Sequence, residues 1–289
     1  MKNRREPVEK RARRRLPKGA AAFLTLLLCL GLISARAETA PMDGYYDLQQ
    51  VVSAEEGETA VLLIDHSYYS GDQIYKGSTG RPLNGACAMH CAAVLISNMR
   101  GEVVTGQQVA KANNRDIRDE RRWTPFVSWG KVASAFGIGV STEDLARYGN
   151  YLKNHRVGTA QRRAMKMARI VEIFRERAGS AGLAIHFNSS GRLNGSGNHR
   201  HAVVLVGYIE RGGEIVDLLI NDSSVAAPAG ACVRMSRSSL PEPIIGAKKY
   251  KKAVEAGEDI AMLLMDYAVS CRWITDNNEG SQLETAADR

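Results

Sequence analysis

The second half of the chain contains four short apolar runs that are separated by polar and glycine-rich stretches. Each run is dense in aliphatic and aromatic side chains over a length that predicts a strand. The runs are GLAIHF (182–187), HAVVLVGYI (201–209), IVDLLIND (215–222) and AMLLMDYAV (261–269). Gly212 and Gly213 lie between the second and third runs, so we expect a hairpin there. An antiparallel sheet is the architecture that this half predicts.

The first half shows helical spacing after a single predicted strand over residues 59–69. The expected helices are residues 88–99 ended by Gly101, one capped by Thr105, one from Pro125 to Gly137, and 159–177. Helices first and an antiparallel sheet later is the order of an α+β fold.

The first 37 residues have the order of a secretory signal. A basic stretch precedes the 16-residue apolar run AAAFLTLLLCLGLISA and the small-x-small sequence Ala35-Arg36-Ala37. The apolar run is shorter than the roughly 20 residues that a membrane-spanning helix needs. We therefore expect cleavage near Ala37 and export to the periplasm or out of the cell. Retention of the segment as an anchor is the alternative.

The net charge of +8 belongs to this leader. The leader holds ten of the 39 Lys and Arg residues and two of the 31 Asp and Glu residues, so 29 of each remain. A nucleic-acid-binding domain would need a basic face. We expect no nucleic acid among the partners, and no stable membrane span after cleavage of the signal.

The residues after the leader suffice for one large domain. We expect a lead-in over residues 38–58, the domain over 59–273 and a polar tail over 274–289. The four cysteines beyond the leader are Cys87, Cys91, Cys232 and Cys271. They are too few for a disulfide scaffold, and Cys232 and Cys271 either pair or remain separate buried thiols.

Cys87 is the candidate nucleophile. It follows the flexible sequence Asn84-Gly85-Ala86 and opens a predicted helix. A free thiol has a pKa of about 8.5, and the positive end of a helix dipole is one device that lowers this pKa. Cys91 lies one turn later among alanine, valine and leucine, so we expect it in the core.

His201 and Asp222 are the candidate partners of Cys87. His201 begins an apolar strand after a polar loop, and Asp222 ends the next run. In a hairpin, the start of the first strand lies beside the end of the second. An imidazole held there can act as general base, and the carboxylate can orient it.

These segments resemble C39-type peptidases, a papain-like family of cysteine peptidases. CAMHCAAVLISNMRG is similar to the motif around the family's catalytic cysteine, and FVSWGKVASAFGIGV to its helix ending in a glycine turn. GLAIHF, HAVVLVGY and LLINDSS resemble three successive strands, of which the second begins with the catalytic histidine and the third ends with aspartate. The likeness covers residues 60–270 and implies a papain-like fold, a Cys87–His201–Asp222 triad, and neither metal nor organic cofactor.

Three positions depart from that family. Ala88 replaces the usual glycine after the cysteine, and Arg81 stands where the oxyanion-hole glutamine is expected. Gln73 or Asn84 would then supply the missing side-chain donor. The family usually has proline straight after the acid, whereas here AAPAG follows Asp222 at a distance.

A zinc site is the competing chemistry. The available donors are Cys87, His90, Cys91, His199 and His201. However, Cys-x2-His-Cys on one helix is not a common zinc spacing. We therefore expect His90 on the helix surface, His199 in a loop, and His186 as a half-buried histidine with its hydrogen bonds satisfied.

The sequence thus predicts an exported cysteine peptidase that hydrolyses peptide bonds in a peptide or protein substrate. Two alternatives stay open. The same triad could serve an amidase or transamidase, or the chain could be a secreted papain-like binding module without activity, as Arg81 and Ala88 would favour. The substrate preference and the oligomeric state are not specified by the sequence.

Overall fold

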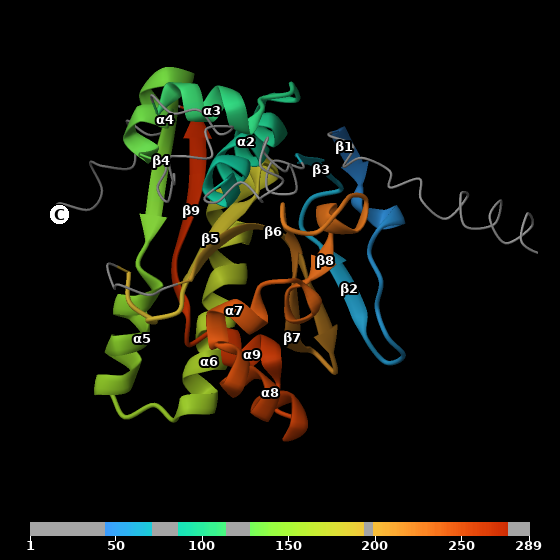
Figure 1. The fold of residues 1–289 in the computed structure, drawn as a ribbon, viewed down its shortest axis with the longest axis vertical. Coiled ribbons are helices and arrows are strands. Elements are labelled where there is room, and N and C mark those ends of the chain that lie inside the picture. Colours follow the sequence, from blue (N-terminus) through green and yellow to red (C-terminus); the bar gives the residue numbers. More distant parts are fainter. Residues whose placement is uncertain (1–43, 71–85, 114–127, 194–198, 277–289) are drawn as a thin grey trace, which may run out of the picture. The chain divides into compact units, whose positions relative to one another are not determined.

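A seven-stranded antiparallel sheet organises the computed structural model, which describes residues 44–70, 86–113, 128–193 and 199–276 (Figure 1). The strand order is β4-β9-β5-β6-β7-β8, and β2 also pairs with β6. Its strands are β2 (Thr59–Leu62), β4 (Ile138–Glu143), β5 (Leu183–Asn188), β6 (Arg200–Arg211), β7 (Glu214–Asn221), β8 (Val233–Arg234) and β9 (Ala268–Asp276). A separate two-stranded sheet pairs β1 (Gly44–Asp47) with β3 (His66–Tyr69). The predicted α+β class and antiparallel sheet are confirmed.

The β6–β7 hairpin is the longest pairing in the sheet. Gly212 and Gly213 form its two-residue turn with φ of 60° and 84°, a left-handed backbone that favours glycine, as the sequence predicted. On its other edge, β6 pairs first with β5 and then with β2. Gly207 permits this second pairing, because a Cβ there would lie 2.5 Å from the Val61 carbonyl oxygen.

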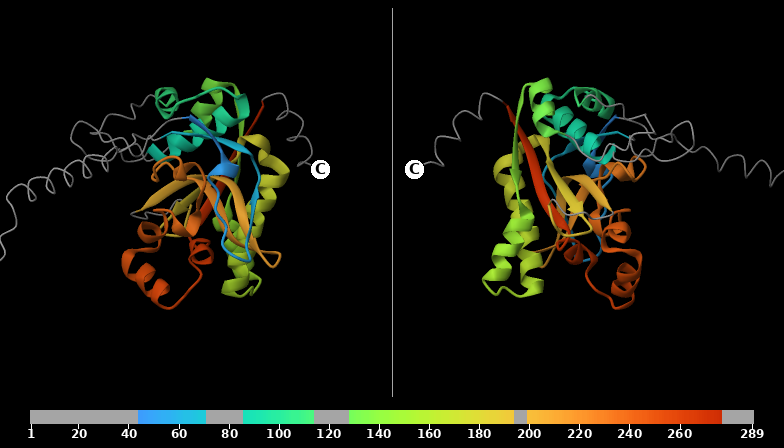
Figure 2. Two further views of the ribbon diagram at one scale, coloured as in Figure 1. Left: turned by 90° about the vertical axis from the view of Figure 1, so that its right-hand side faces the viewer. Right: turned by 60° about the vertical axis from the view of Figure 1, so that its left-hand side comes forward.

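Helices cover both faces of the sheet (Figures 1 and 2). They are α2 (Ala86–Arg100), α3 (Gly106–Ala112), α4 (Trp129–Phe136), α5 (Leu145–Asn154), α6 (Thr159–Ile173), α7 (Pro241–Ile245), α8 (Ala247–Glu255) and α9 (Ile260–Leu264). Short turns of 3-10 helix span Leu48–Gln50, Gly179–Ala181, Ala229–Ala231 and Met235–Arg237, and a π-helical turn, Phe174–Ala178, follows α6.

The two-residue period of the strands separates two cores. Ala184, Ala202 and Val204 pack with α2 in one cluster. The intervening residues, among them Ile185 and Val203, pack with α6 and α9 in the other. α2 is therefore enclosed by apolar neighbours, and residues 86–97 are all buried.

Two predicted elements differ from the structure. The expected strand 59–69 is divided into β2 and β3. The expected strand 261–269 is helix α9 followed by the first residues of β9. The side chain of Asp259 accepts a hydrogen bond from the Met262 amide and caps α9. The helix is buried in the larger core, so its residues are apolar and imitate a strand.

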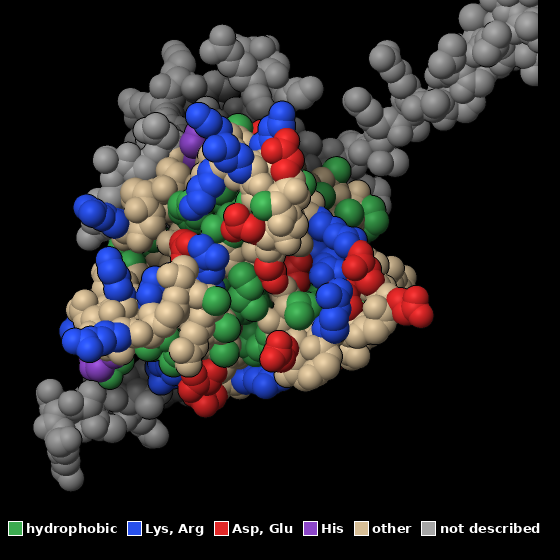
Figure 3. Space-filling view, turned by 90° about the horizontal axis from the view of Figure 1, so that it is seen from below, with side chains coloured by type: hydrophobic (Ala, Val, Ile, Leu, Met, Phe, Trp, Pro, Cys, Tyr) green, Lys and Arg blue, Asp and Glu red, His purple; other side chains and the backbone are tan. Residues whose placement is uncertain are grey.

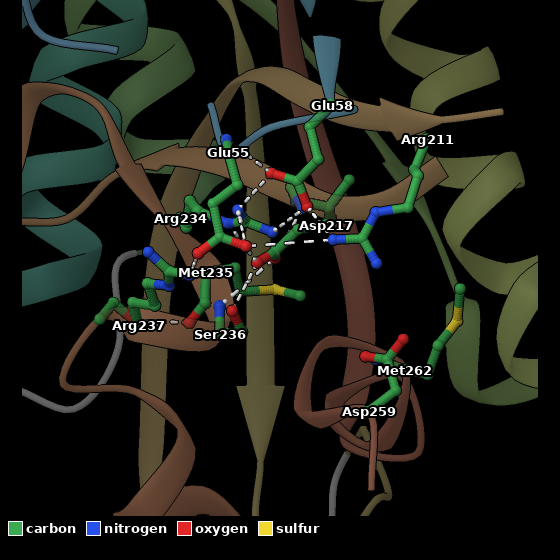
Figure 4. A network of polar contacts seen from close by, with 12 residues as sticks. Glu55, Glu58, Arg211, Asp217, Arg234, Met235, Ser236, Arg237, Asp259 and Met262 are labelled. Carbon is green, nitrogen blue, oxygen red and sulfur yellow. Dashed lines mark hydrogen bonds and ion pairs between the residues drawn. The ribbon is translucent and has the colours of Figure 1, made fainter. Parts of the chain in front are cut away.

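The residues before β2 are tied to the sheet by an ion-pair network of Glu55, Glu58, Arg211, Asp217, Arg234, Ser236 and Arg237 (Figure 4). Arg234 donates to Glu58 at 2.6 Å and to the buried Asp217 at 3.3 Å. The part of the expected lead-in that the structure describes thus carries β1 and contacts with β6 and β8.

Charged side chains of both signs are interspersed on the face that Figure 3 shows. None of the helices in the described segments is long and apolar enough to cross a bilayer. The predicted signal, residues 1–37, lies outside the described residues, as does most of the predicted tail.

Candidate active site

Cys87 is the second residue of α2 and is 8% exposed. The helix begins at Ala86, two residues before the predicted start, so Cys87 occupies its first turn. The first backbone N–H groups of a helix have no partner within the helix, and they give this end a partial positive charge. The position therefore favours a thiolate.

His201 and Asp222 lie side by side, where β6 begins and β7 has just ended. His201 Nε2 and Asp222 Oδ1 are 2.9 Å apart, and Asp222 is fully buried. The same Oδ1 accepts the backbone N–H and the hydroxyl of Ser224. An ionised carboxylate only accepts hydrogen bonds, so Nε2 of His201 carries the proton, and Nδ1 is the nitrogen that remains for another partner.

The thiol of Cys87 is that partner. It hydrogen-bonds to the imidazole of His201, and the backbone N–H of Ala202 also reaches the sulfur. Sequence analysis expected Cys87, His201 and Asp222 to meet, and the structure connects the three side chains by hydrogen bonds through His201.

The pKa shifts of Cys87, His201 and Asp222 favour an ion pair between the thiolate and the imidazolium. Burial alone raises the pKa of Cys87, but the hydrogen bond and charge of His201 outweigh it, so the thiol pKa lies below its ordinary value. Burial lowers the pKa of His201, yet Asp222 and the thiolate raise it to about 10. Asp222 stays ionised, because His201 and Ser224 outweigh its burial and lower its pKa. Each of the three shifts favours a thiolate beside an imidazolium over a neutral thiol beside a neutral imidazole.

His90 was expected on the helix surface, and that prediction is wrong. It is fully buried, and its Nε2 lies 2.8 Å from Asn221 Oδ1. The amide of Asn221 donates to the Tyr68 carbonyl oxygen and to Ser67 Oγ, which fixes its orientation. Nε2 of His90 is therefore the donor. Burial lowers the pKa of His90 to about 4, so it is neutral at pH 7.

This contact links α2 to β3 and to the end of β7. His90 is one helical turn from Cys87, and Asn221 directly precedes Asp222. Both members of the link are fully buried. Sequence reasoning missed them, because a lone histidine in an apolar helix gives no local signal of a partner 131 residues away.

The remaining residues singled out by the sequence are the other cysteines, the possible metal ligands and the oxyanion-hole donors. Cys91 is fully buried, as predicted, and burial raises its pKa well above the ordinary value. The described cysteines are all free thiols, Cys232 and Cys271 included. Within the described segments, no three His, Cys, Asp or Glu side chains are arranged to hold a metal ion. Gln73 and Asn84, the predicted oxyanion-hole donors, lie outside the described residues.

Several buried polar atoms in or around the group of Cys87, His201 and Asp222 have no hydrogen-bond partner in the described part of the chain. They are Ser70 Oγ, His90 Nδ1, Trp129 Nε1, His186 Nε2, Asp222 Oδ2 and Ser270 Oγ. The expectation that His186 is fully satisfied is therefore wrong. Native proteins leave few buried polar groups unpaired, and such groups call for an explanation.

Comparison with known proteins finds a structural similarity but no family. No family model matches the sequence, and no curated protein matches it. Among solved structures, the crystal structure of UfSP from C. elegans is similar with a TM-score of 0.39 and 11% sequence identity. The alignment covers 81% of this chain and 37% of that chain, so this chain spans well under half of the other's length.

Proposed function

We propose that this chain is a cysteine peptidase with a papain-like fold, in which Cys87 is the nucleophile, His201 the general base and acid, and Asp222 the group that orients His201. One observation carries the proposal. The Cys87 thiol bonds to the imidazole, whose other nitrogen lies 2.9 Å from a buried carboxylate. A structural cysteine needs neither a lowered pKa nor a histidine held in this way.

The reaction follows from this arrangement. His201 takes the thiol proton, and the thiolate forms a bond to the carbonyl carbon of a peptide. The carbonyl oxygen gains negative charge beside the first N–H groups of α2, with Gln73 or Asn84 as the proposed side-chain donor. The imidazolium then protonates the leaving amine as the C–N bond breaks, which gives a thioester. Finally His201 deprotonates a water molecule, which attacks the thioester and releases the acid and the thiolate.

The place of action that we propose is outside the cytoplasm, after removal of residues 1–37. The order of basic, apolar and small residues in the leader supports this. The proposed substrate is a peptide or protein, because an acyl group with an amine leaving group suits a thiolate paired with an imidazolium.

The first experiment measures the alkylation rate of each cysteine by iodoacetamide against pH, read by mass spectrometry. The variants are Cys87→Ser, His201→Ala and Asp222→Asn, with His155→Ala as a matched control, since His155 is an exposed histidine on the C-cap of α5. We expect fast labelling of Cys87 well below pH 8. We expect His201→Ala to slow it at least about 10-fold at pH 7, because the thiolate fraction then follows an ordinary thiol pKa.

Labelling that follows an ordinary thiol pKa in the unmodified protein, unchanged by His201→Ala, would contradict the peptidase. It would leave the binding module as the better interpretation. If Cys87 is reactive, peptide cleavage with and without an added amine separates hydrolysis from transamidation, because only a transamidase joins the acyl group to the amine.

A further inference from the structure

Four polar side chains gather on the α2 side of the sheet, close to the start of β6, where His201 lies. Trp129 comes from the start of α4, His186 from β5, and Ser270 and Arg272 from β9. We refer to these four residues as the polar cluster. The rings of Trp129 and His186 meet edge to face, with centroids 6.3 Å apart, and the Arg272 guanidinium lies 5.6 Å from the centre of the Trp129 ring. His186 and Ser270 are directly opposite each other in the β5–β9 pairing.

The polar cluster adjoins the nucleophile through one strand. His186 is directly opposite Ala202 in the β5–β6 pairing, and the Ala202 N–H bonds to the Cys87 thiol. Side chains at opposite positions of neighbouring strands are about 5 Å apart. A peptide whose carbonyl carbon reaches the Cys87 sulfur therefore brings its neighbouring side chains within reach of the polar cluster.

Three atoms of the polar cluster lack a hydrogen-bond partner in the described part of the chain: Trp129 Nε1, His186 Nε2 and Ser270 Oγ. Trp129 is 7% exposed and Ser270 is 1% exposed. The indole N–H is a donor only, and the hydroxyl can donate. Burial and the charge of Arg272 lower the pKa of His186 to about 3, so its ring is neutral and adds no charge of its own. The unpartnered atoms of the polar cluster are thus mainly hydrogen-bond donors.

Arg272 supplies an uncompensated positive charge. It donates to Thr142 Oγ1 at 3.3 Å, and no carboxylate pairs with it among the described residues. Other arginines of the same fold, such as Arg163 and Arg234, reach a carboxylate oxygen at 2.6 Å. Burial lowers the pKa of Arg272, as expected for a cation that is partly removed from water without a counterion.

We propose that the polar cluster is a specificity subsite that binds a carboxylate of the substrate, an aspartate or glutamate side chain close to the scissile bond. This inference rests on the proposed function. A carboxylate accepts hydrogen bonds from the indole, the hydroxyl and the guanidinium, and it compensates the charge of Arg272. A substrate lysine would be repelled by Arg272, and a neutral amide would leave that charge unpaired.

The test uses matched peptide vinyl sulfones that carry either Glu or Gln at one of the two residues nearest the reactive group. The rate constant for labelling of Cys87 is measured for each peptide. We expect the better-placed Glu peptide to react about 10-fold faster than its Gln counterpart, since a hydrogen bond to a charged group has roughly this effect. Arg272→Gln should remove most of this preference, and Ser270→Ala should reduce it about 3-fold.

Arg100→Gln is the matched control, because Arg100 also lies over an aromatic ring, that of Phe136 at 5.7 Å, but at the far end of α2. It should keep the preference for Glu. If Arg272→Gln fails to fold, Ser270→Ala carries the test.

Equal rates for Glu and Gln at both positions, or a preference that survives Arg272→Gln, would overturn the subsite while leaving the reactivity of Cys87 intact. Failure of every peptide to label Cys87 faster than a free thiol would overturn the proposed function instead. In that case, equilibrium binding of the Glu and Gln peptides to Cys87→Ala decides the subsite. A preference for Glu that Arg272→Gln abolishes would support it.

Discussion

The β6–β7 hairpin carries a buried carboxylate toward each end, and the two carboxylates differ in how many of their oxygens are hydrogen-bonded. Toward the Gly212–Gly213 turn, both oxygens of Asp217 are occupied by Leu218, Arg234 and Ser236. At the open end, Asp222 uses Oδ1 for His201 and Ser224, while its Oδ2 has no hydrogen-bond partner in the described segments.

The same contrast extends to the surroundings. None of the unpartnered buried atoms found in the described segments belongs to the ion-pair network, and several lie around Cys87 and His201. A saturated network holds elements together. A site that must receive a substrate keeps donors and acceptors free, at a cost in stability. We therefore assign the ion-pair network to the fold and the open end to chemistry, and four substitutions test that division.

The largest effect is expected from Arg234→Met. The side chain of Arg234 is 11% exposed and bridges Glu58 and Asp217. Its removal leaves the buried Asp217 without a cationic partner, so we expect a loss of about 3 kcal/mol in the free energy of unfolding, measured with urea. The alkylation rate of Cys87 in the folded variant should remain unchanged. Slower alkylation of Cys87 in this variant would contradict the assignment of the ion-pair network to the fold alone.

Asp222→Asn is the converse test. Asparagine can keep an oxygen toward Ser224 but carries no charge. The pKa of His201 therefore falls from about 10, and the imidazolium that lowers the pKa of the Cys87 thiol is less populated at pH 7. We expect the labelling of Cys87 at pH 7 to slow about 10-fold, equivalent to one pKa unit. The free energy of unfolding should fall by less than in Arg234→Met, because His201 can lose its proton and become neutral, and the asparagine oxygen can still accept from Ser224. A loss as large as that of Arg234→Met would assign Asp222 to the fold instead.

The sequence predicted those parts of the molecule that local patterns determine. The glycine turn sets which strands pair, and this pairing places the start of β6 beside the end of β7; hence His201 and Asp222 could be expected to meet. The position of Cys87 at a helix start follows from the apolar spacing after Gly85.

What the sequence could not indicate depends on contacts between distant segments. The burial of His90 and its hydrogen bond to Asn221 exist only because α2 packs on β6 and β3, which brings His90 to the end of β7. The polar cluster requires α4, β5 and β9 to converge, and no spacing within one segment reports this. Helix α9 was taken for a strand because its five residues are all apolar and too few to show a helical period.

The third test concerns the His90–Asn221 contact, which belongs to the open end and joins two fully buried side chains. His90→Leu leaves Asn221 Oδ1 without its donor in the core, so we expect a loss of about 1–2 kcal/mol in the free energy of unfolding. Since Asn221 precedes Asp222, we also expect labelling of Cys87 to slow about 3-fold, with a shifted pH profile. His90→Gln can donate to the same oxygen and should restore much of both. If His90→Leu changes stability but leaves the pH profile intact, the contact is structural only.

The smallest expected effect is the dependence of stability on acid. The direction of this dependence tests whether the ion-pair network stabilises Glu58 in its ionised form. Hydrogen bonds from Arg234 and the Glu55 backbone lower the pKa of Glu58 from 4.5 to about 2. A carboxylate with a depressed pKa contributes stability that is fully present above its unfolded pKa and is lost as the pH falls toward the folded value. The difference in unfolding free energy between the unmodified protein and Glu58→Gln should therefore be constant above about pH 5 and shrink between pH 4.5 and pH 2. The reactivity of Cys87 should not depend on Glu58 at any pH. A stability difference that grows with acid would mean that Glu58 is stabilised in its protonated form, and Arg234 would then be paired through Asp217 alone.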